Sequence, residues 1–319
     1  MGNFQNSMSH KDLKWDYSDP VNGQSLPAPF FYSPDIFEQE KINIFMNCWH
    51  FVGHSNEFKE PGSYVVQDVF EQSVVITKEK DGNIYAWHNV CRHRGNRLMN
   101  ERRGKVNGML RCPYHSWCYS LNGDLRAAPR TEHLDSFSKK DHSLRTVRLE
   151  IFAGWVFITL DDNALPISEM MVGAELEMRN FLPDMDNVEL VEETDVIVNA
   201  NWKVIQENSI EGYHFDLSGP VHKDLAALID FKGYRLTAYN NYWTYIGPPN
   251  NNVTHAYGLP LDGATWQTDS FFNIGLWPNT TFYSFPYTDM VGVFIMIPLA
   301  PEKSLLRFSY YAPRGRPVP

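Results

Sequence analysis

The sequence has no uninterrupted apolar run long enough to cross a lipid bilayer, and its first 17 residues lack the apolar stretch of a secretory signal peptide. It also lacks an excess of basic residues, because 28 Lys and Arg stand against 38 Asp and Glu, a formal net charge of −10. Such an acidic chain is a poor partner for nucleic acid or an anionic membrane. We therefore expect a cytoplasmic protein with no membrane and no nucleic-acid partner.

Cysteine is scarce too, with four in 319 residues. Cys48 and Cys118 are most simply small buried hydrophobic residues in a reducing compartment. The other two each precede a histidine, in two pairs separated by 18 residues: Cys91-x-His93 and Cys112-x-x-His115. Two thiolates and two imidazoles from two loops can hold a [2Fe–2S] cluster of the Rieske type, in which the cysteines bind one iron and the histidines the other.

The alternative for four such ligands is a structural zinc site. Zinc modules usually open with Cys-x2–4-Cys, a pairing that this sequence lacks. The stretches 73–90 and 110–129 indicate two β-hairpins, with turns at Asp81-Gly82 and Asn122-Gly123. Gly95 gives the first loop backbone freedom behind its ligand pair. Metal loops carried on hairpins suit a small β-domain, so the cluster is favoured over zinc, and a disulfide comes last.

The sequence contains no GxGxxG motif and no P-loop, so it offers no evident nucleotide site, and the electrons for a cluster should come from another protein. We expect an N-terminal arm (1–39) that packs on the second domain, a strand-rich domain (40–155) and that second domain (156–319). Within the last, the pattern predicts an amphipathic helix over 174–182 and a strand over 189–202.

A second set of metal-binding residue types follows that strand. If residues 201–214 are one helix, Asn208, Glu211 and His214 fall at i, i+3 and i+6, close to one face. His214 and His222 are then candidates for two ligands of a 2-His-1-carboxylate site for non-haem Fe(II), which leaves positions open for O2. The plainer alternative is a surface Glu–His pair on a helix, with His222 unrelated to it.

The two Cys–His pairs resemble those of the Rieske domain of ring-hydroxylating oxygenase α subunits. The similarity extends through further short strings: Phe31-Tyr32, CWHFVG at 48–53, Pro61-Gly62 and GWVF at 154–157. Respiratory and photosynthetic Rieske proteins carry an additional cysteine in each box, and these form a disulfide over the cluster. Asn96 and Tyr114 stand at the corresponding positions here, so the oxygenases are the nearer family.

The second stretch is similar to the catalytic domain of the same oxygenases through Asn201-Trp202-Lys203, Glu207-Asn208 and Glu211-x-Tyr213-His214. The resemblance implies that His214 and His222 bind iron. It also implies that Asn208 and Glu211 are catalytic residues, with Glu211 hydrogen-bonding an iron-ligating histidine and a cluster histidine of an adjacent subunit.

The same resemblance implies a homotrimer that receives electrons from NAD(P)H through a separate reductase, with or without a ferredoxin. Electrons would pass through His115, Glu211 and His214 to iron, where O2 is activated for hydroxylation or oxidative demethylation of a small organic substrate.

Three features depart from the family pattern. Most members have Asp where Glu211 stands, and Glu is similar to the subset acting on carnitine, choline and glycine betaine. Seven residues, rather than the common four, separate His214 from His222. The third iron ligand of the family is a carboxylate near the chain's end, and neither Asp289 nor Glu302 has a matching context, so we expect that ligand beyond residue 319.

The second domain is rich in aromatic residues, which can hold a quaternary ammonium group by cation–π attraction or line a pocket for a flat aromatic substrate. They are Tyr239, Tyr242, Trp243, Tyr245, Trp266, Phe271, Phe272, Trp277, Tyr283 and Phe285. The expected fold is α+β, an all-β Rieske domain plus a catalytic domain of helix-grip type with a curved antiparallel sheet. The alternatives are an aromatic-acid oxygenase and a non-catalytic Rieske electron-transfer or redox protein.

Overall fold

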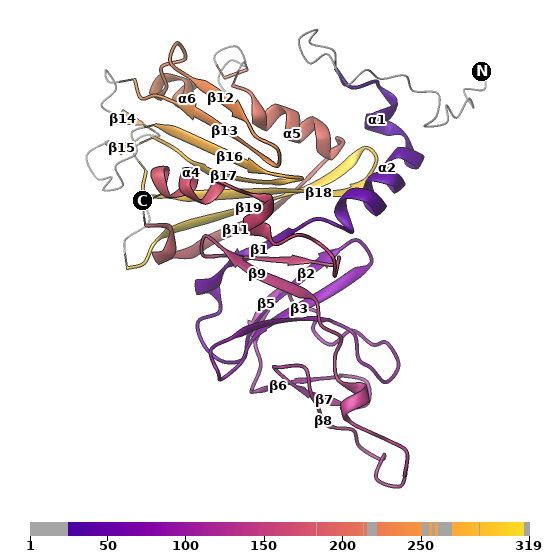
Figure 1. Ribbon diagram of the computed structural model, residues 1–319. Helices are drawn as coiled ribbons and strands as arrows, with labels where there is room; N and C mark the ends of the chain where they lie inside the picture. Colours follow the sequence, from indigo (N-terminus) through magenta and orange to yellow (C-terminus); the bar gives the residue numbers. More distant parts are fainter. Residues whose placement is uncertain are drawn as a thin grey trace, which may run out of the picture.

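The computed structural model describes residues 25–182, 184–212, 214–215, 222–250, 255–256, 259–260, 270–286 and 288–315. Its antiparallel sheets are stacked from one end of the molecule to the other (Figure 1). A small sheet lies at one end and is followed by a four-stranded, a three-stranded and a seven-stranded sheet, with a helix over the last one. In this described part, no helix is long and apolar enough to span a membrane.

The four-stranded sheet has the order β4-β3-β2-β5. Its strands are β2 (Ser63–Val69), β3 (Gln72–Lys78), β4 (Ile84–His88) and β5 (Arg103–Lys105). β3 and β4 pair antiparallel around the Asp81-Gly82 turn, where Gly82 has a φ of +87° that favours glycine. The hairpin predicted for residues 73–90 is therefore confirmed.

The small sheet has the order β6-β7-β8, with β6 (Met109–Arg111), β7 (Cys118–Ser120) and β8 (Leu125–Ala127). The β7–β8 turn contains Gly123 at a φ of +81°, as predicted for the hairpin in 110–129. A shared core fills the space between this sheet and the four-stranded one, and both Cys91 and Cys112 belong to it. The predicted cluster cysteines therefore lie in a hydrophobic layer rather than at the surface.

The three-stranded sheet, of order β1-β10-β9, joins the two halves of the molecule. It contains β1 (His50–His54), β9 (Arg148–Phe152) and β10 (Trp155–Thr159). Because side chains alternate along a strand, Val156 and Ile158 pack toward the four-stranded sheet, while Trp155 and Phe157 pack toward the seven-stranded one. The predicted domain boundary at 155/156 falls inside β10, and the division of the chain stays a prediction.

The seven-stranded antiparallel sheet has the order β11-β19-β18-β17-β16-β13-β12. Its strands are β11 (Val188–Val198), β12 (Arg235–Ala238), β13 (Tyr242–Gly247), β16 (Phe271–Leu276), β17 (Thr280–Ser284), β18 (Val291–Ala300) and β19 (Lys303–Pro313). A separate pair is formed by β14 (His255–Ala256) and β15 (Leu259–Pro260). β11 confirms the strand predicted over 189–202 but ends at Val198, before the cap of the next helix at Asn201. The α+β class is confirmed.

Short helices connect these sheets. They are 3-10 helices η4 (Ser55–Glu57), η5 (Lys140–His142) and η6 (Met185–Asn187), and α-helices α3 (Ile167–Met170) and α4 (Ala174–Phe181). α4 is the predicted amphipathic helix: it buries Ala174 and Met178 against the sheet and carries Glu175 and Glu177 in its first turn. Acidic residues are favourable at that position because they face the positive end of the helix dipole.

The N-terminal segment consists of α1 (Pro29–Tyr32), α2 (Pro34–Glu40) and the π-helical turn η3 (Lys41–Phe45). The buried carboxylate of Glu40 accepts hydrogen bonds from Lys203 Nζ at 2.6 Å and from Trp202 Nε1 at 2.9 Å. Both partners belong to α5 (Trp202–Ile210), which lies over the seven-stranded sheet. The segment thus packs on the part of the chain that contains the predicted iron ligands.

A half-buried charge network joins the start of β5 to the seven-stranded sheet. Glu193 of β11 accepts hydrogen bonds from Arg102 Nε at 2.7 Å and from Arg103. Burial raises the pKa of Glu193, but these two guanidinium groups outweigh it and lower that pKa to about 2. Next to it, Arg307 pairs with Asp195 at 2.7 Å. The network fixes how the two halves meet.

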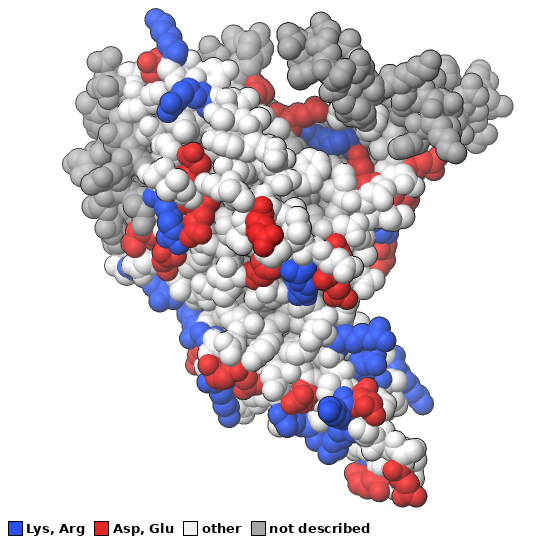
Figure 2. Space-filling view, in the orientation of Figure 1, with Lys and Arg blue, Asp and Glu red and all other residues white. Residues whose placement is uncertain are grey.

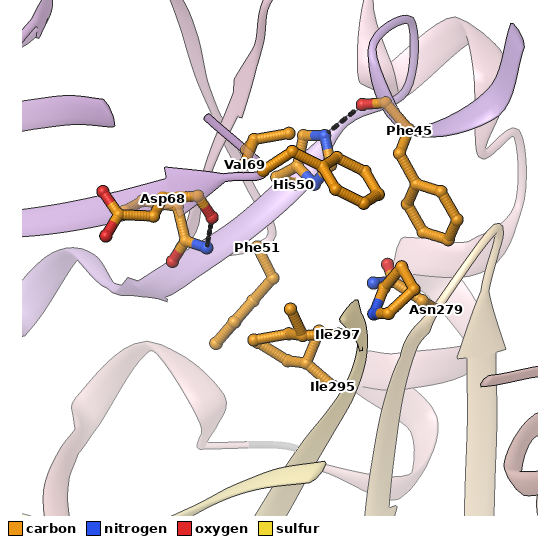
Figure 3. A pocket seen from close by; sticks show the side chains of 11 residues that line it. Phe45, His50, Phe51, Asp68, Val69, Asn279, Ile295 and Ile297 are labelled. Carbon is orange, nitrogen blue, oxygen red and sulfur yellow. Dashed lines mark hydrogen bonds between the residues drawn. The ribbon is translucent and has the colours of Figure 1, made fainter. Parts of the chain in front are cut away.

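A small cavity of about 30 Å³ lies at the same junction (Figure 3). It lies between His50 of β1 and Asn279 and Ile295 near β17 and β18, and its volume is far too small for an organic substrate. Burial lowers the pKa of His50 to about 4, and its Nε2 lies 2.6 Å from the Phe45 carbonyl. Burial also raises the pKa of the adjacent Cys48 thiol, as expected for a small hydrophobic residue rather than a reactive one.

Candidate metal centres

The two Cys–His loops have the same backbone design. Cys91 N donates to the Asn96 carbonyl at 2.8 Å, and Gly95 N donates to the Cys91 carbonyl at 3.0 Å. In the second loop Cys112 N donates to the Trp117 carbonyl at 2.8 Å, and Ser116 N donates to the Cys112 carbonyl at 3.0 Å. Gly95 and Ser116 hold equivalent places at φ of +71° and +60°. The loops are a structurally matched pair.

The cysteines and histidines of these loops differ in burial. Cys91 and Cys112 are each 2% exposed, whereas His93 is exposed and His115 is half-buried. The two imidazole rings lie 4.7 Å apart between centroids. His115 Nδ1 is buried and has no hydrogen-bond partner, a costly arrangement for a ring nitrogen unless it binds a metal. The residues therefore fit a cluster with one iron on an inner thiolate pair and the other on an outer imidazole pair.

Side chains that the sequence analysis did not single out surround this site. Tyr119 Oη accepts a hydrogen bond from Arg92 N at 2.9 Å and lies 3.4 Å from Cys91 Sγ. Burial raises the pKa of the Cys91 thiol, while Tyr119 lowers it. Trp117 stacks on His93, with ring centroids 4.9 Å apart and planes at 9°. Trp117 and Tyr119 are two residues apart, so strand periodicity would have placed both on the inner face.

The helix predicted for residues 201–214 is shorter than expected. Asn201 caps its start by accepting from Lys203 N at 3.0 Å, but α5 ends at Ile210 and Glu211 is extended (φ −117°, ψ 152°). The prediction of helix through His214 is wrong. The helix ends early because the chain packs closely at Gly212, where a Cβ would lie 2.2 Å from the Tyr245 hydroxyl of β13. This tertiary contact holds the backbone in an extended conformation.

The three side chains nevertheless meet beyond the helix end. Glu211 Oε1 lies 2.7 Å from His214 Nδ1, and Asn208 Nδ2 makes a longer contact with the same ring at 3.4 Å. A carboxylate on Nδ1 holds the proton on that nitrogen, which leaves Nε2 with the lone pair that binds a metal. The expected grouping of Asn208, Glu211 and His214 is thus present in a different backbone conformation.

His214 and His222 lie side by side, with ring centroids 5.1 Å apart. His222 is the residue before α6 (Lys223–Leu228). Burial, followed by the neighbouring His214, lowers the pKa of His222, which favours the neutral imidazole that ligates metals. Tyr213 and most of the seven-residue spacer lie outside the described residues. The donor set therefore fits two histidine ligands of Fe(II).

Among the described residues, no carboxylate joins His214 and His222 in a group of three side chains that could hold one metal ion. Glu302 lies exposed in the turn between β18 and β19, as its position after Pro301 suggests. The expectation that the third iron ligand lies beyond residue 319 stays a prediction.

An aromatic cluster adjoins the histidine pair. Phe215 lies 4.8 Å from the ring of His214 and 5.0 Å from that of His222. It packs with buried residues of the seven-stranded sheet: Trp243, Tyr245 and Phe271. These side chains share the sheet face that α5 covers, because Trp243 and Tyr245 alternate with Tyr242 and Thr244 of the opposite face.

Uncharged polar atoms lie on the same sheet face without hydrogen-bond partners. They are Trp243 Nε1, Tyr245 Oη, Asn273 Oδ1 and Thr281 Oγ1. Gln206 Oε1 of α5 is also buried without a hydrogen-bond partner. Cross-strand pairing places Asn273 beside Tyr245, and Gly275 between Trp243 and Thr281. Buried polar atoms are rarely left unsatisfied, so this face offers both donors and acceptors to a bound molecule.

Comparison with known proteins agrees with this arrangement. Residues 48–138 match the Rieske [2Fe-2S] domain model, and residues 185–318 match the model of the ring hydroxylating alpha subunit (catalytic domain). The chain is 30% identical to the carnitine monooxygenase oxygenase subunit of Acinetobacter baumannii over 92% of its own length and 77% of that protein. It is 35% identical to the glycine betaine monooxygenase oxygenase subunit of Chromohalobacter salexigens over 61% of this chain and 43% of that one.

Among solved structures, a quaternary ammonium Rieske monooxygenase, described for carnitine oxidation by gut microbiota and inter-subunit electron transfer, superimposes with a TM-score of 0.82 at 29% identity. It covers 92% of this chain and 77% of that one. The matched domains imply a [2Fe–2S] cluster and Fe(II), which the donor sets above fit. The chain belongs to the Rieske non-haem iron oxygenase α subunits, which are oxidoreductases.

Proposed function

We propose that this chain is the oxygenase subunit of a monooxygenase that hydroxylates or oxidatively demethylates a quaternary ammonium compound. The observation that carries the proposal is the aromatic cluster of Phe215, Tyr245 and Phe271 directly beside the His214–His222 pair. Aromatic faces attract a permanent cation by about 0.5–2 kcal/mol each. The relatives named for carnitine and glycine betaine support the same substrate class.

In this proposal Cys91, His93, Cys112 and His115 hold the cluster, and His214 and His222 hold the iron. When bound, the two groups supply one-electron storage and O2 activation. Glu211 keeps the proton of His214 on Nδ1, and the buried Tyr119 hydroxyl donates to the Cys91 sulfur. The unpartnered polar atoms of the sheet face bind the polar end of the substrate without adding a second charge near its cation.

Electrons reach the iron from a neighbouring subunit in this proposal. The Cys–His loops and the histidine pair lie at opposite ends of the sheet stack, with the four-stranded, the three-stranded and the seven-stranded sheet between them (Figure 1). A ring of three identical subunits, with the loops of one facing the histidine pair of the next, shortens that path. A separate reductase, with or without a ferredoxin, supplies the electrons, and the assembly works in the cytoplasm.

The test is O2 uptake by the reconstituted holoprotein with a reductant and matched substrates. Glycine betaine is compared with 3,3-dimethylbutanoate, in which carbon replaces the cationic nitrogen, and L-carnitine and choline extend the series. We expect substrate-dependent O2 uptake with a quaternary amine and at least a several-fold loss with the isostere that lacks the cationic nitrogen, because cation–π attraction needs the positive charge.

Equal uptake with the isostere would overturn the substrate class. Uptake with 2-aminobenzenesulfonate but not with amines would favour an aromatic-acid oxygenase, since the chain is also 35% identical to a 2-aminobenzenesulfonate 2,3-dioxygenase α subunit over 58% of its length. Cluster oxidation with no product from any substrate would indicate a plain electron-transfer protein.

A further inference from the structure

Two open hollows on the Rieske side of the molecule adjoin each other through two shared lining residues. The first, of about 440 Å³, is lined by His88, Leu144, Arg145, Thr146, Val147, Thr159, Leu160 and Asp162. The second, of about 210 Å³, is lined by Gln72, His88, Val90, Arg92 and Arg145. Because both share His88 and Arg145, we call them together the His88 groove. It ends at Arg92, the residue after the buried Cys91.

The walls of the His88 groove are fixed by backbone hydrogen bonds between segments far apart in sequence. His88 N at the end of β4 donates to the Arg145 carbonyl at 3.0 Å, and Val147 N donates to the Ala86 carbonyl at 2.9 Å. Trp87 and Thr146 form a bridge between them. The groove is therefore a preformed surface, which reduces the ordering cost of binding.

The end of the groove near the Cys–His loops is basic and partly apolar. Arg145 is exposed and can pair with a carboxylate of a partner, and the half-buried Arg92 adds a second positive charge beside it. Val90 lies between them and is 40% exposed. Burial and Arg145 lower the pKa of His88, which leaves its imidazole neutral, and Asp162 places one carboxylate at the far end.

Positive charge is concentrated in the part of the chain that contains the Cys–His loops. Residues 90–148 contain 13 Lys and Arg against five Asp and Glu, whereas the full chain has 28 against 38. In the space-filling view, Lys and Arg gather over the lower, Rieske part of the molecule, with an acidic group at its tip (Figure 2). A basic surface on an acidic protein attracts an acidic partner locally.

We propose that the His88 groove is the docking site for an acidic electron-carrier protein. The inference rests on the proposed function and names the surface at which its electron donor binds. Carboxylates of the carrier pair with Arg92 and Arg145, and an apolar side chain packs on Val90. One electron then passes from the reduced carrier to the group held by Cys91, with no bond made or broken. Val90 and Arg92 flank Cys91 in the chain, so a carrier docked on them lies next to a proposed cluster ligand.

The test uses a reduced plant-type [2Fe–2S] ferredoxin as an acidic probe and anaerobic stopped-flow mixing with the oxidised holoprotein. Arg145→Glu is compared with Lys80→Glu, which makes the same change of charge at the turn of the β3–β4 hairpin, roughly 20 Å along the strands from the groove. Photoreduced 5-deazariboflavin, a small neutral reductant, reports cluster accessibility without docking.

We expect Arg145→Glu to slow reduction by ferredoxin about tenfold or more at low salt and to flatten its salt dependence, as loss of electrostatic steering does. Lys80→Glu should change the rate less than about twofold, and deazariboflavin should reduce all three proteins alike. Equal effects of the two variants, or no ferredoxin reduction of the parent beyond the deazariboflavin rate, would overturn the docking site.

Analytical sedimentation of the same proteins tests the alternative occupant of the groove, a second copy of this chain. A change in oligomeric state on Arg145→Glu would mean that the groove binds a second copy of the chain, and would also overturn the proposal. Failure of the proposed function would be recognised by a different result. Protein reduced by deazariboflavin would then form no product from any substrate, whatever the rate of its reduction by ferredoxin.

Discussion

Glu211 Oε1 lies 2.7 Å from His214 Nδ1, just beyond the end of α5. The contact selects the tautomer of His214, because a proton on Nδ1 leaves Nε2 with the lone pair that can bind a metal. His222 lies beside the same ring, at 5.1 Å between centroids. One carboxylate therefore orients the residue on which the proposed iron site depends.

Replacing Glu211 by Gln tests this positioning role. The amide keeps the size but loses the charge, so both metals should stay bound and reduction of the cluster should be normal, while electron transfer to iron slows severely. Reoxidation of the pre-reduced cluster after mixing with substrate and O2 measures that step. Asn208→Ala is a useful comparison, since its 3.4 Å contact is too long to hold the tautomer. A Gln variant that reoxidises with product formation at the parent rate would show that Glu211 has no such role.

His214→Ala should remove the second metal centre without touching the first. The two donor sets lie at opposite ends of the sheet stack, so the cluster spectrum should be unchanged while turnover is lost. Iron analysis should fall from about three atoms per chain to about two, with sulfide constant. Retained activity in this variant would mean that iron is held elsewhere.

Cys91→Ser should abolish the visible absorption and the paramagnetic signal of the reduced protein. Cys91 is 2% exposed and belongs to the core between two sheets, so loss of the cluster should also lower thermal stability. Cys118→Ser is the control, because Cys118 bonds only the Ser116 carbonyl. Stoichiometric zinc without acid-labile sulfide in anaerobically prepared protein would contradict the cluster assignment.

Tyr119→Phe should lower the reduction potential of the cluster. The Tyr119 hydroxyl lies 3.4 Å from Cys91 Sγ, and a donor to a ligand sulfur stabilises the more negative, reduced state. A hydrogen bond worth about 1 kcal/mol corresponds to roughly 40 mV for one electron. Tyr85→Phe, whose hydroxyl bonds Asp81 instead, should leave the potential unchanged. A redox titration that gives both variants the parent's reduction potential would show that Tyr119 does not influence the cluster.

Glu193→Gln should weaken the junction between the two halves by about 3 kcal/mol, because Arg102 and Arg103 would lose the half-buried carboxylate that they share. The pKa of Glu193 is lowered to about 2 in the fold, so its contribution is present above its ordinary pKa near 4.3 and is lost as pH falls toward 2. The parent should therefore lose stability between about pH 5 and pH 2, and the variant should lose less.

Glu189→Gln on the same strand provides the control, since its ion pair with Lys59 is exposed and 3.6 Å long. We expect it to change unfolding free energy by less than about 0.5 kcal/mol. Denaturant unfolding of both variants across that pH range makes the comparison. Identical pH profiles for parent and Glu193→Gln would show that the network does not stabilise the junction.

Local sequence signals predicted the features that depend on neighbours along the chain. Asp81-Gly82 and Asn122-Gly123 predicted both hairpins because a glycine in each turn adopts positive φ. The helix over residues 174–182 and the strand after residue 188 followed from periodicity alone. The Cys–His spacing predicted a shared metal site, and the structure brings the two loops together.

Contacts between distant segments could not be predicted in the same way. The end of α5 is set by the packing of Tyr245 against Gly212, 33 residues away. Local spacing cannot show this contact, so the helix predicted over 201–214 was too long. Arg102 and Glu193 meet across 91 residues, and His88 and Arg145 across 57. Such pairs depend on sheet order and register, which periodicity does not specify.

The most direct test of the account is a single turnover of fully pre-reduced holoprotein mixed with O2 and L-carnitine or glycine betaine, following the cluster absorbance and the product together. The account predicts that cluster reoxidation is accelerated by substrate and is accompanied by a stoichiometric amount of hydroxylated or demethylated product. Reoxidation at the same rate with and without substrate, and with no product, would contradict it.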